Sequence, residues 1–150
     1  MKLSILSVVL LMIGVFLSAC GNAPIASASN SSPEPAAVED QASLIAALET
    51  AGATVASGEP ISQPFFNVEG NIVKVNGADV QVFQYESAEE MELDSSQIAP
   101  DGGSNATTMI TWIDTPHFYK TGRIIALYIG SDETILSLLE TVMGAQFAGQ

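Results

Sequence analysis

His117 is the first candidate for catalysis, because it is the only histidine of the chain. Asp114 lies three residues before it and could orient the imidazole. A hydrolase of the triad type also needs a serine on a strained turn, and no Gly-x-Ser-x-Gly motif occurs in the sequence. A hydrolase that uses His117 and Asp114 is therefore the least favoured hypothesis. We interpret His117 as a half-buried, hydrogen-bonded residue at the start of a strand and expect that the protein is not an enzyme.

The sequence has few residues that could bind a metal ion or a nucleotide cofactor. A structural zinc site needs four nitrogen or sulfur ligands, whereas the chain has one histidine and one cysteine. The acidic run at residues 86–94 offers oxygen ligands for calcium, but the EF-hand spacing is absent and such runs are usually solvated helix faces. The loop at residues 101–104 lacks the lysine of a phosphate-binding loop. We expect no metal site and no cofactor.

Four side chains are the candidates for a binding surface, namely Trp112, His117, Tyr119 and Arg123. The aromatic residues of the chain are numerous enough to line a ligand groove, although a domain of this size needs most of them in its core. Tyr119, Lys120 and Arg123 form a local basic spot on an otherwise acidic protein. This spot could receive an anionic group or simply keep the end of a hairpin soluble.

Cys20 is the only cysteine, and it follows an apolar N-terminal stretch. Lys2 supplies a positive charge, residues 3–16 are apolar except for two serines and a glycine, and small residues lead up to the cysteine. This is the layout of a cleaved export signal. The segment Leu17-Ser18-Ala19-Cys20 resembles the lipobox of bacterial lipoproteins.

The resemblance implies that cleavage precedes Cys20 and that this residue receives a diacylglycerol thioether and becomes the acylated mature N-terminus. The protein would then be attached by lipid to the cell membrane or the outer membrane, with its domain on the extracytoplasmic side. Two or three acyl chains make a stable anchor, whereas one binds reversibly. A transmembrane helix, which needs about 20 apolar residues, and an ordinary secretory signal cleaved near residues 18–23 are the alternatives.

The charge of the mature chain restricts its partners. Without the signal, 17 acidic residues face only Lys74, Lys120 and Arg123, so the formal charge is about −14. Such a surface is repelled by phosphate backbones and by anionic lipid headgroups, which excludes nucleic acid as an expected partner. With its only thiol acylated, the chain has no disulfide and must be held by its core. The expected partners are the membrane, through the lipid on Cys20, and another envelope protein.

Composition divides the chain into three segments. Residues 1–19 are the predicted signal peptide, and residues 20–37 are the lipidated cysteine with a flexible tether rich in Ser, Pro, Asn and Ala. The tether has no periodic apolar face and cannot offset its ordering entropy. Residues 38–150 are the size of a single small domain. Two of its segments, residues 63–66 and 116–119, resemble those of small bacterial lipoprotein domains to which no activity is attached.

Periodicity within residues 38–150 predicts three helices and several strands. The helices are expected at residues 39–51, 87–97 and 131–143, the second beginning with a Ser87–Glu90 capping box. Asn76-Gly77 supplies the tight turn of a hairpin between residues 72–75 and 80–85. Further strands are expected at residues 54–56, where Gly58-Glu59-Pro60 follows as the stop, and at residues 107–113, 117–120 and 123–129.

The expected fold is α+β, with an antiparallel or mixed sheet of four to six strands and about three helices packed on one face. The favoured function is a lipid-anchored cell-envelope protein whose domain binds or scaffolds a partner without catalysis. The alternative is a lipoprotein that binds a small molecule or a divalent ion, through the aromatic residues around Trp112 and Phe118 or through the acidic run.

Overall fold

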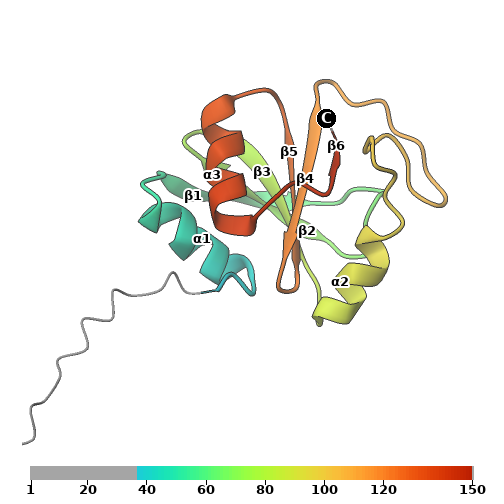
Figure 1. Ribbon diagram of the computed structural model, residues 1–150, viewed down its shortest axis with the longest axis horizontal. Helices are drawn as coiled ribbons and strands as arrows, with labels where there is room; N and C mark the ends of the chain where they lie inside the picture. Colours follow the sequence, from blue (N-terminus) through green and yellow to red (C-terminus); the bar gives the residue numbers. More distant parts are fainter. Residues whose placement is uncertain (1–36, 150) are drawn as a thin grey trace, which may run out of the picture. The chain divides into compact units, whose positions relative to one another are not determined.

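The computed structural model describes residues 37–149. Residues 37–149 form three helices and six strands, drawn in Figure 1. In chain order these are α1 (Gln41–Thr50), β1 (Val55–Ile61), β2 (Gly70–Val75), β3 (Ala78–Gln84), α2 (Ala88–Ser95), β4 (Pro116–Thr121), β5 (Ile124–Ile129), α3 (Glu133–Met143) and β6 (Ala148–Gly149). The expected α+β class is confirmed. The predictions for the signal, for Cys20 and for most of the tether lie outside the described residues.

The six strands form one sheet in the order β1-β2-β3-β5-β4-β6, and every neighbouring pair is antiparallel. The predicted hairpin joins β2 to β3, with Asn76 at φ 52° and Gly77 at φ 90°, which are the positive angles that a two-residue turn requires. A second hairpin joins β4 to β5. No helix within residues 37–149 is long and apolar enough to cross a bilayer.

One face of the sheet, here called the helical face, is covered by α1 and α3. Leu44 and Leu48 of α1 and Ile135 and Leu139 of α3 are buried there. The sheet contributes every second residue of its central strands to this cluster, namely Val73, Val75, Val80, Val82, Tyr119, Ile124, Ala126 and Tyr128. Alternation along each strand sends the residues between them to the opposite face.

That opposite face, here called the aromatic face, is covered by α2 and by two loops. Its buried residues are Phe65, Phe66, Phe83, Tyr85, Met91, Ile98, Phe118, Ile125, Leu127 and Ala148. We expected from the sequence that all the helices would pack on one face of the sheet. Met91 of α2 belongs to this cluster instead, so α2 packs on the opposite face from α1 and α3. Every residue of β5 from Ile124 to Tyr128 is buried, so both faces of the sheet need a cover.

Three further expectations about strands and caps are wrong. Residues 107–113 form no strand of the sheet, and only an isolated bridge joins Ser104 to Met109. β1 continues through residues 58–60, where its register against β2 shifts between Ser57 and Pro60, as in a bulge. Helix α3 does not begin at residue 131 as expected but is capped by Asp132, whose side chain accepts a hydrogen bond from the Thr134 amide.

A buried polar cluster fastens α2 to the sheet. The Asp94 carboxylate accepts a hydrogen bond of 2.7 Å from the Tyr85 hydroxyl, one of 3.0 Å from the Asn67 backbone amide and one of 2.6 Å from the Asn67 side chain. Burial, and then the hydrogen bond to Asp94, raise the pKa of Tyr85. The neutral phenol therefore contributes stability that is present below the unfolded pKa of about 10 and is lost at higher pH.

We predict that Tyr85→Phe lowers the free energy of unfolding at pH 8 by about 1.5–3 kcal/mol, because the buried Asp94 carboxylate loses a hydrogen-bond donor. The loss of stability above pH 10 should be shallower in Tyr85→Phe than in the wild type, because the group that ionises has been removed. Urea unfolding at several pH values measures both effects.

Tyr128→Phe is the matched control for this prediction. The Tyr128 hydroxyl accepts a longer bond of 3.3 Å from the Asp132 amide. Its removal should cost less, about 0.5–1.5 kcal/mol. Equal slopes in Tyr85→Phe and the wild type would contradict the role given to Tyr85.

Candidate functional site

The four candidate binding residues do not form one site. His117 and Tyr119 belong to β4 and point to the helical face, where Tyr119 is part of the buried cluster. Trp112 packs against the aromatic face, on the other side of the sheet. Arg123 lies in the turn between β4 and β5 and pairs with Asp40. The sheet itself thus separates Trp112 from His117 and Tyr119.

His117 is buried, with 7% of its surface exposed. Its Nδ1 lies 2.7 Å from Oε1 of Gln146, within hydrogen-bond distance. The ring stacks on Tyr128 at a centroid distance of 6.2 Å. The Asp114 carboxylate accepts a hydrogen bond from the Thr115 amide at 2.7 Å. His117 is hydrogen-bonded as expected, but more deeply buried, and Gln146 rather than Asp114 orients it.

The expected basic spot is divided between two ion pairs. Nη2 of Arg123 lies 3.3 Å from Oδ2 of Asp40, the N-cap of α1. Hydrogen bonds from Ser43, followed by the contact with Arg123, lower the pKa of Asp40. Lys120 is on the aromatic face of β4 and pairs with Glu92 of α2. Both cations of this region are engaged within the domain.

Tyr119 is buried among the residues of the helical face. Burial, and then the negative charge of Glu140, raise the pKa of its phenol. A side chain buried in the core offers little surface to a partner, so Tyr119 contributes to packing rather than to an exposed binding surface.

Trp112 holds the loop between α2 and β4 against the aromatic face. Its Nε1 donates a hydrogen bond of 2.8 Å to the Gly102 carbonyl. Its ring meets Phe65 and Phe118 edge to face, at centroid distances of 5.5 and 6.0 Å. The inner side of the loop is therefore fixed to the core, while its outer side faces solvent.

The outer side carries two large apolar side chains that sequence reasoning missed as surface residues. Met109 is 88% exposed and Ile113 is 97% exposed, whereas Ile110 and Trp112 between them pack on the aromatic face. We call residues 108–113 the exposed segment. Single exposed apolar residues are ordinary, but two on the same side of a fixed segment are a candidate contact surface. The alternation that predicted a strand is the sequence signal for this surface.

The backbone of the exposed segment is paired along one edge only. The Ile110 amide donates to the Gly103 carbonyl at 3.0 Å, and the Thr108 carbonyl accepts from the Asn105 amide at 2.9 Å. In an extended chain, alternate residues direct their amides to opposite edges. The amides of Met109 and Thr111 therefore face the other edge, where no acceptor within residues 37–149 meets them.

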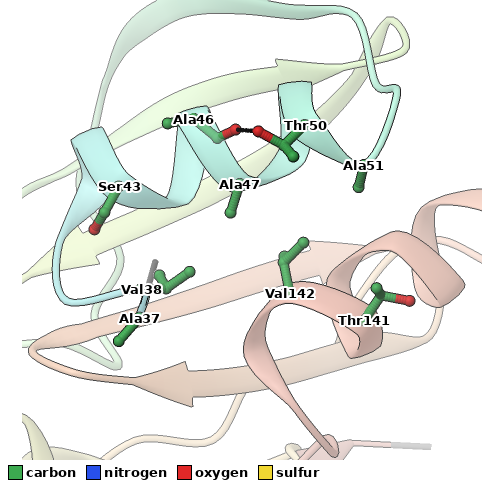
Figure 2. A pocket seen from close by; sticks show the side chains of 9 residues that line it. All are labelled: Ala37, Val38, Ser43, Ala46, Ala47, Thr50, Ala51, Thr141 and Val142. Carbon is green, nitrogen blue, oxygen red and sulfur yellow. Dashed lines mark hydrogen bonds between the residues drawn. The ribbon is translucent and has the colours of Figure 1, made fainter. Parts of the chain in front are cut away.

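A concave feature lies between α1 and α3, on the outside of the helical face (Figure 2). It is a half-open groove of about 350 Å³ with no charged residue in its walls. Figure 2 shows Ala47 of α1 and Ala51, the C-cap of that helix, opposite Val142 and Thr141 of α3. The volume suits a small ligand, but the Thr50 hydroxyl donates to the Ala46 carbonyl within α1, so little polar recognition remains.

Metal coordination has no support from the described part of the chain. Within residues 37–149, no three His, Cys, Asp or Glu side chains lie close enough together to hold an ion. The acidic residues around α2 are instead engaged singly, as in the pairs of Glu92 with Lys120 and of Asp94 with Tyr85.

Comparison of the chain with protein-family models, with curated proteins and with solved structures found no match.

We predict that Gly102→Ala detaches Trp112 from the core. Gly102 has φ +68°, and a Cβ there would lie 2.6 Å from Cε2 of Phe118, so both the backbone and the ring must shift. Because Trp112 is the only tryptophan, its fluorescence should move to longer wavelength as it becomes solvated. We expect a loss of about 1–3 kcal/mol in the free energy of unfolding, as for other overpacked cores.

Gly103→Ala is the matched control for Gly102→Ala. A Cβ at Gly103 would approach no atom closer than Oδ1 of Asp101 at 3.5 Å, an ordinary contact. Its emission maximum should equal that of the wild type. If the two variants behave alike, the loop is not held through Gly102 and Trp112.

Proposed function

We propose that this protein is a lipid-anchored component of a bacterial cell envelope and that its 38–150 domain binds or scaffolds a protein partner without catalysis. The observation that carries the proposal is the outward side of the exposed segment, where Met109 and Ile113 stand 88% and 97% exposed above an inner side anchored by Trp112. A contact surface of this kind is apolar and already ordered before a partner arrives.

The position of the exposed segment suits a domain that is attached through its N-terminus. The backbone carbonyl of Glu39 accepts a hydrogen bond from the Arg123 amide, at the turn between β4 and β5. The exposed segment leads into the opposite end of β4, at Pro116. Figure 1 accordingly has the start of α1 and the loop before β4 on opposite sides of the domain. An anchor upstream of α1 would leave the exposed segment free to meet a partner.

The energy available at this surface supports a reversible contact. Full burial of an aliphatic side chain contributes about 1.5–3 kcal/mol, so Met109 and Ile113 together supply only a few kcal/mol before association costs are met. Attachment to a membrane raises the effective concentration of a partner in the same envelope. The lipid on Cys20 therefore complements a weak protein contact.

Binding of a small apolar molecule is the second candidate function. The groove between α1 and α3, with its volume of about 350 Å³ and uncharged walls, favours it. The groove lacks convergent polar groups that would select one ligand, which is why we rank this function below protein binding.

We predict that the mature wild-type chain begins at Cys20 and carries the added mass of a diacylglycerol. Cys20→Ala should lack that mass and keep residues 1–19, because both steps need the thiol. Mass spectrometry of the N-terminal peptide from a bacterial envelope measures both properties. Ser27→Ala, a change in the predicted tether, should be processed like the wild type. An unlipidated N-terminus near residues 18–23, or one at Met1, would contradict the anchor.

We predict that Met109→Asp and Ile113→Asp each lower partner recovery by about tenfold or more, because a carboxylate would be desolvated without a counter-charge. The tagged full chain is crosslinked in the envelope, solubilised and purified, and the recovered proteins are identified by mass spectrometry. Leu93→Asp is the control, since Leu93 is 62% exposed but lies on α2. Equal recovery with Met109→Asp and with the wild type would remove the exposed segment as the surface.

A further inference from the structure

We propose that the exposed segment pairs with the same segment of a second copy of this chain, as two antiparallel strands centred on Thr111. The inference rests on the proposed function, since it names the partner of that surface. Pairing of this kind is β-augmentation, in which main-chain hydrogen bonds supply affinity and alternate side chains supply register.

The backbone of the segment suits this pairing because its open edge presents both donors and acceptors. The Ile110 amide and the Thr108 carbonyl form hydrogen bonds within the domain, along the edge of the segment that faces residues 103–105. Met109 and Thr111 follow the other parity, so their amides and carbonyls face away from residues 103–105, and the chain bends at Ile113. A two-fold axis through Thr111 matches each of these amides with a carbonyl of the second copy. Thr111 would exchange both hydrogen bonds with its own counterpart.

The side chains are self-complementary in the same register. Pairing about Thr111 places Met109 opposite Ile113 of the second copy, and Ile113 opposite its Met109. These are the two large apolar side chains of the segment that face solvent. Cross-strand apolar pairs and Thr–Thr pairs each contribute about 0.2–1 kcal/mol. If the pairing shifted by one residue, the exposed side chains of one copy would lie opposite the inward-facing side chains of the other. Burial of the inward side chains therefore specifies the register.

The distribution of charge favours a second copy over a basic foreign strand. Residues 102–113 contain no charged side chain, although the whole chain carries a net charge of −13. A partner attracted by charge would be drawn to the acidic residues around α2 rather than to this neutral stretch. In the proposed register, Asp114 lies opposite Thr108 rather than another carboxylate. Two acidic domains can thus meet along their neutral segments.

The proposed dimer is weak in dilute solution. Two short strands bury less surface than the about 1,200 Å² of a stable interface, and like-charged domains repel. Salt should strengthen the contact, because screening shortens the range of the repulsion from about 10 Å at 0.1 M to about 3 Å at 1 M. Confinement to one membrane would raise the local concentration of copies.

Cysteine crosslinking of the full chain in its membrane tests the register. Paired residues in such strands have Cα atoms about 5.5 Å apart, within the range of about 4.4–6.8 Å that a disulfide spans. Thr111→Cys should form a dimer under mild oxidation, to a several-fold greater extent at high salt. Met109→Cys alone should not form a dimer, because residue 109 of one copy lies opposite residue 113, and not residue 109, of the other. Met109→Cys mixed with Ile113→Cys should form a heterodimer.

Leu93→Cys is the control for random collision, because Leu93 is exposed on α2. Crosslinking of Thr111→Cys no greater than that of Leu93→Cys overturns the proposal, and so does crosslinking of Met109→Cys alone as efficient as that of Thr111→Cys. Trp112 emission confirms in each variant that the loop is still folded. If Thr111→Cys forms no dimer and a different envelope protein is recovered in a way that depends on Met109, the proposal of a second copy is overturned and the partner is a foreign protein.

Failure of the anchor can be distinguished from failure of the pairing. Cys20 is the only natural cysteine, so the purified wild type should not react with a maleimide if that thiol is acylated. A reactive wild type contradicts the lipid anchor, whereas an unreactive wild type with no Thr111→Cys dimer contradicts only the self-pairing.

Discussion

The pairing of β3 with β5 is the contact on which the rest of the domain depends. It joins the β2–β3 hairpin to the β4–β5 hairpin, in a register that sets Val82 opposite Ala126. β5 then lies inside the sheet with both its faces buried. Its alternate residues go to α1 and α3 on one side and to the aromatic cluster on the other. Two separate covers are therefore required, and the loop that carries the exposed segment is part of the second.

This two-sided burial also decides which residues remain available for function. The side chains that looked suited to binding are engaged in the fold, His117 with Gln146, Trp112 with Gly102 and Arg123 with Asp40. Within residues 37–149, no buried side-chain polar atom lacks a hydrogen-bond partner. The unpaired surface is instead apolar and lies at the exposed segment. Our proposals accordingly rest on contact between surfaces rather than on a reactive group.

Local signals predicted much of the fold but less of the candidate site. The Asn76-Gly77 turn and the Ser87 cap of α2 occur where the sequence places them, because each depends on neighbouring residues alone. The strand expected at residues 107–113 failed for a non-local reason. Its alternation indicates only that one side is buried, and a strand of the sheet also needs a neighbouring strand to pair with. Residues 108–110 instead bond to residues 103–105 of their own loop.

The sequence by itself determined the acidic charge, the single cysteine, the hairpin turn and the α+β class, since these follow from composition and from residues close together along the chain. Only the tertiary structure decided which side chains share a face. That choice depends on the register between strands distant in sequence, and a strand's residues alternate between faces, so Trp112 and His117 were separated by the sheet. It also decided that Met109 and Ile113 face solvent, because their segment packs on the core without joining the sheet.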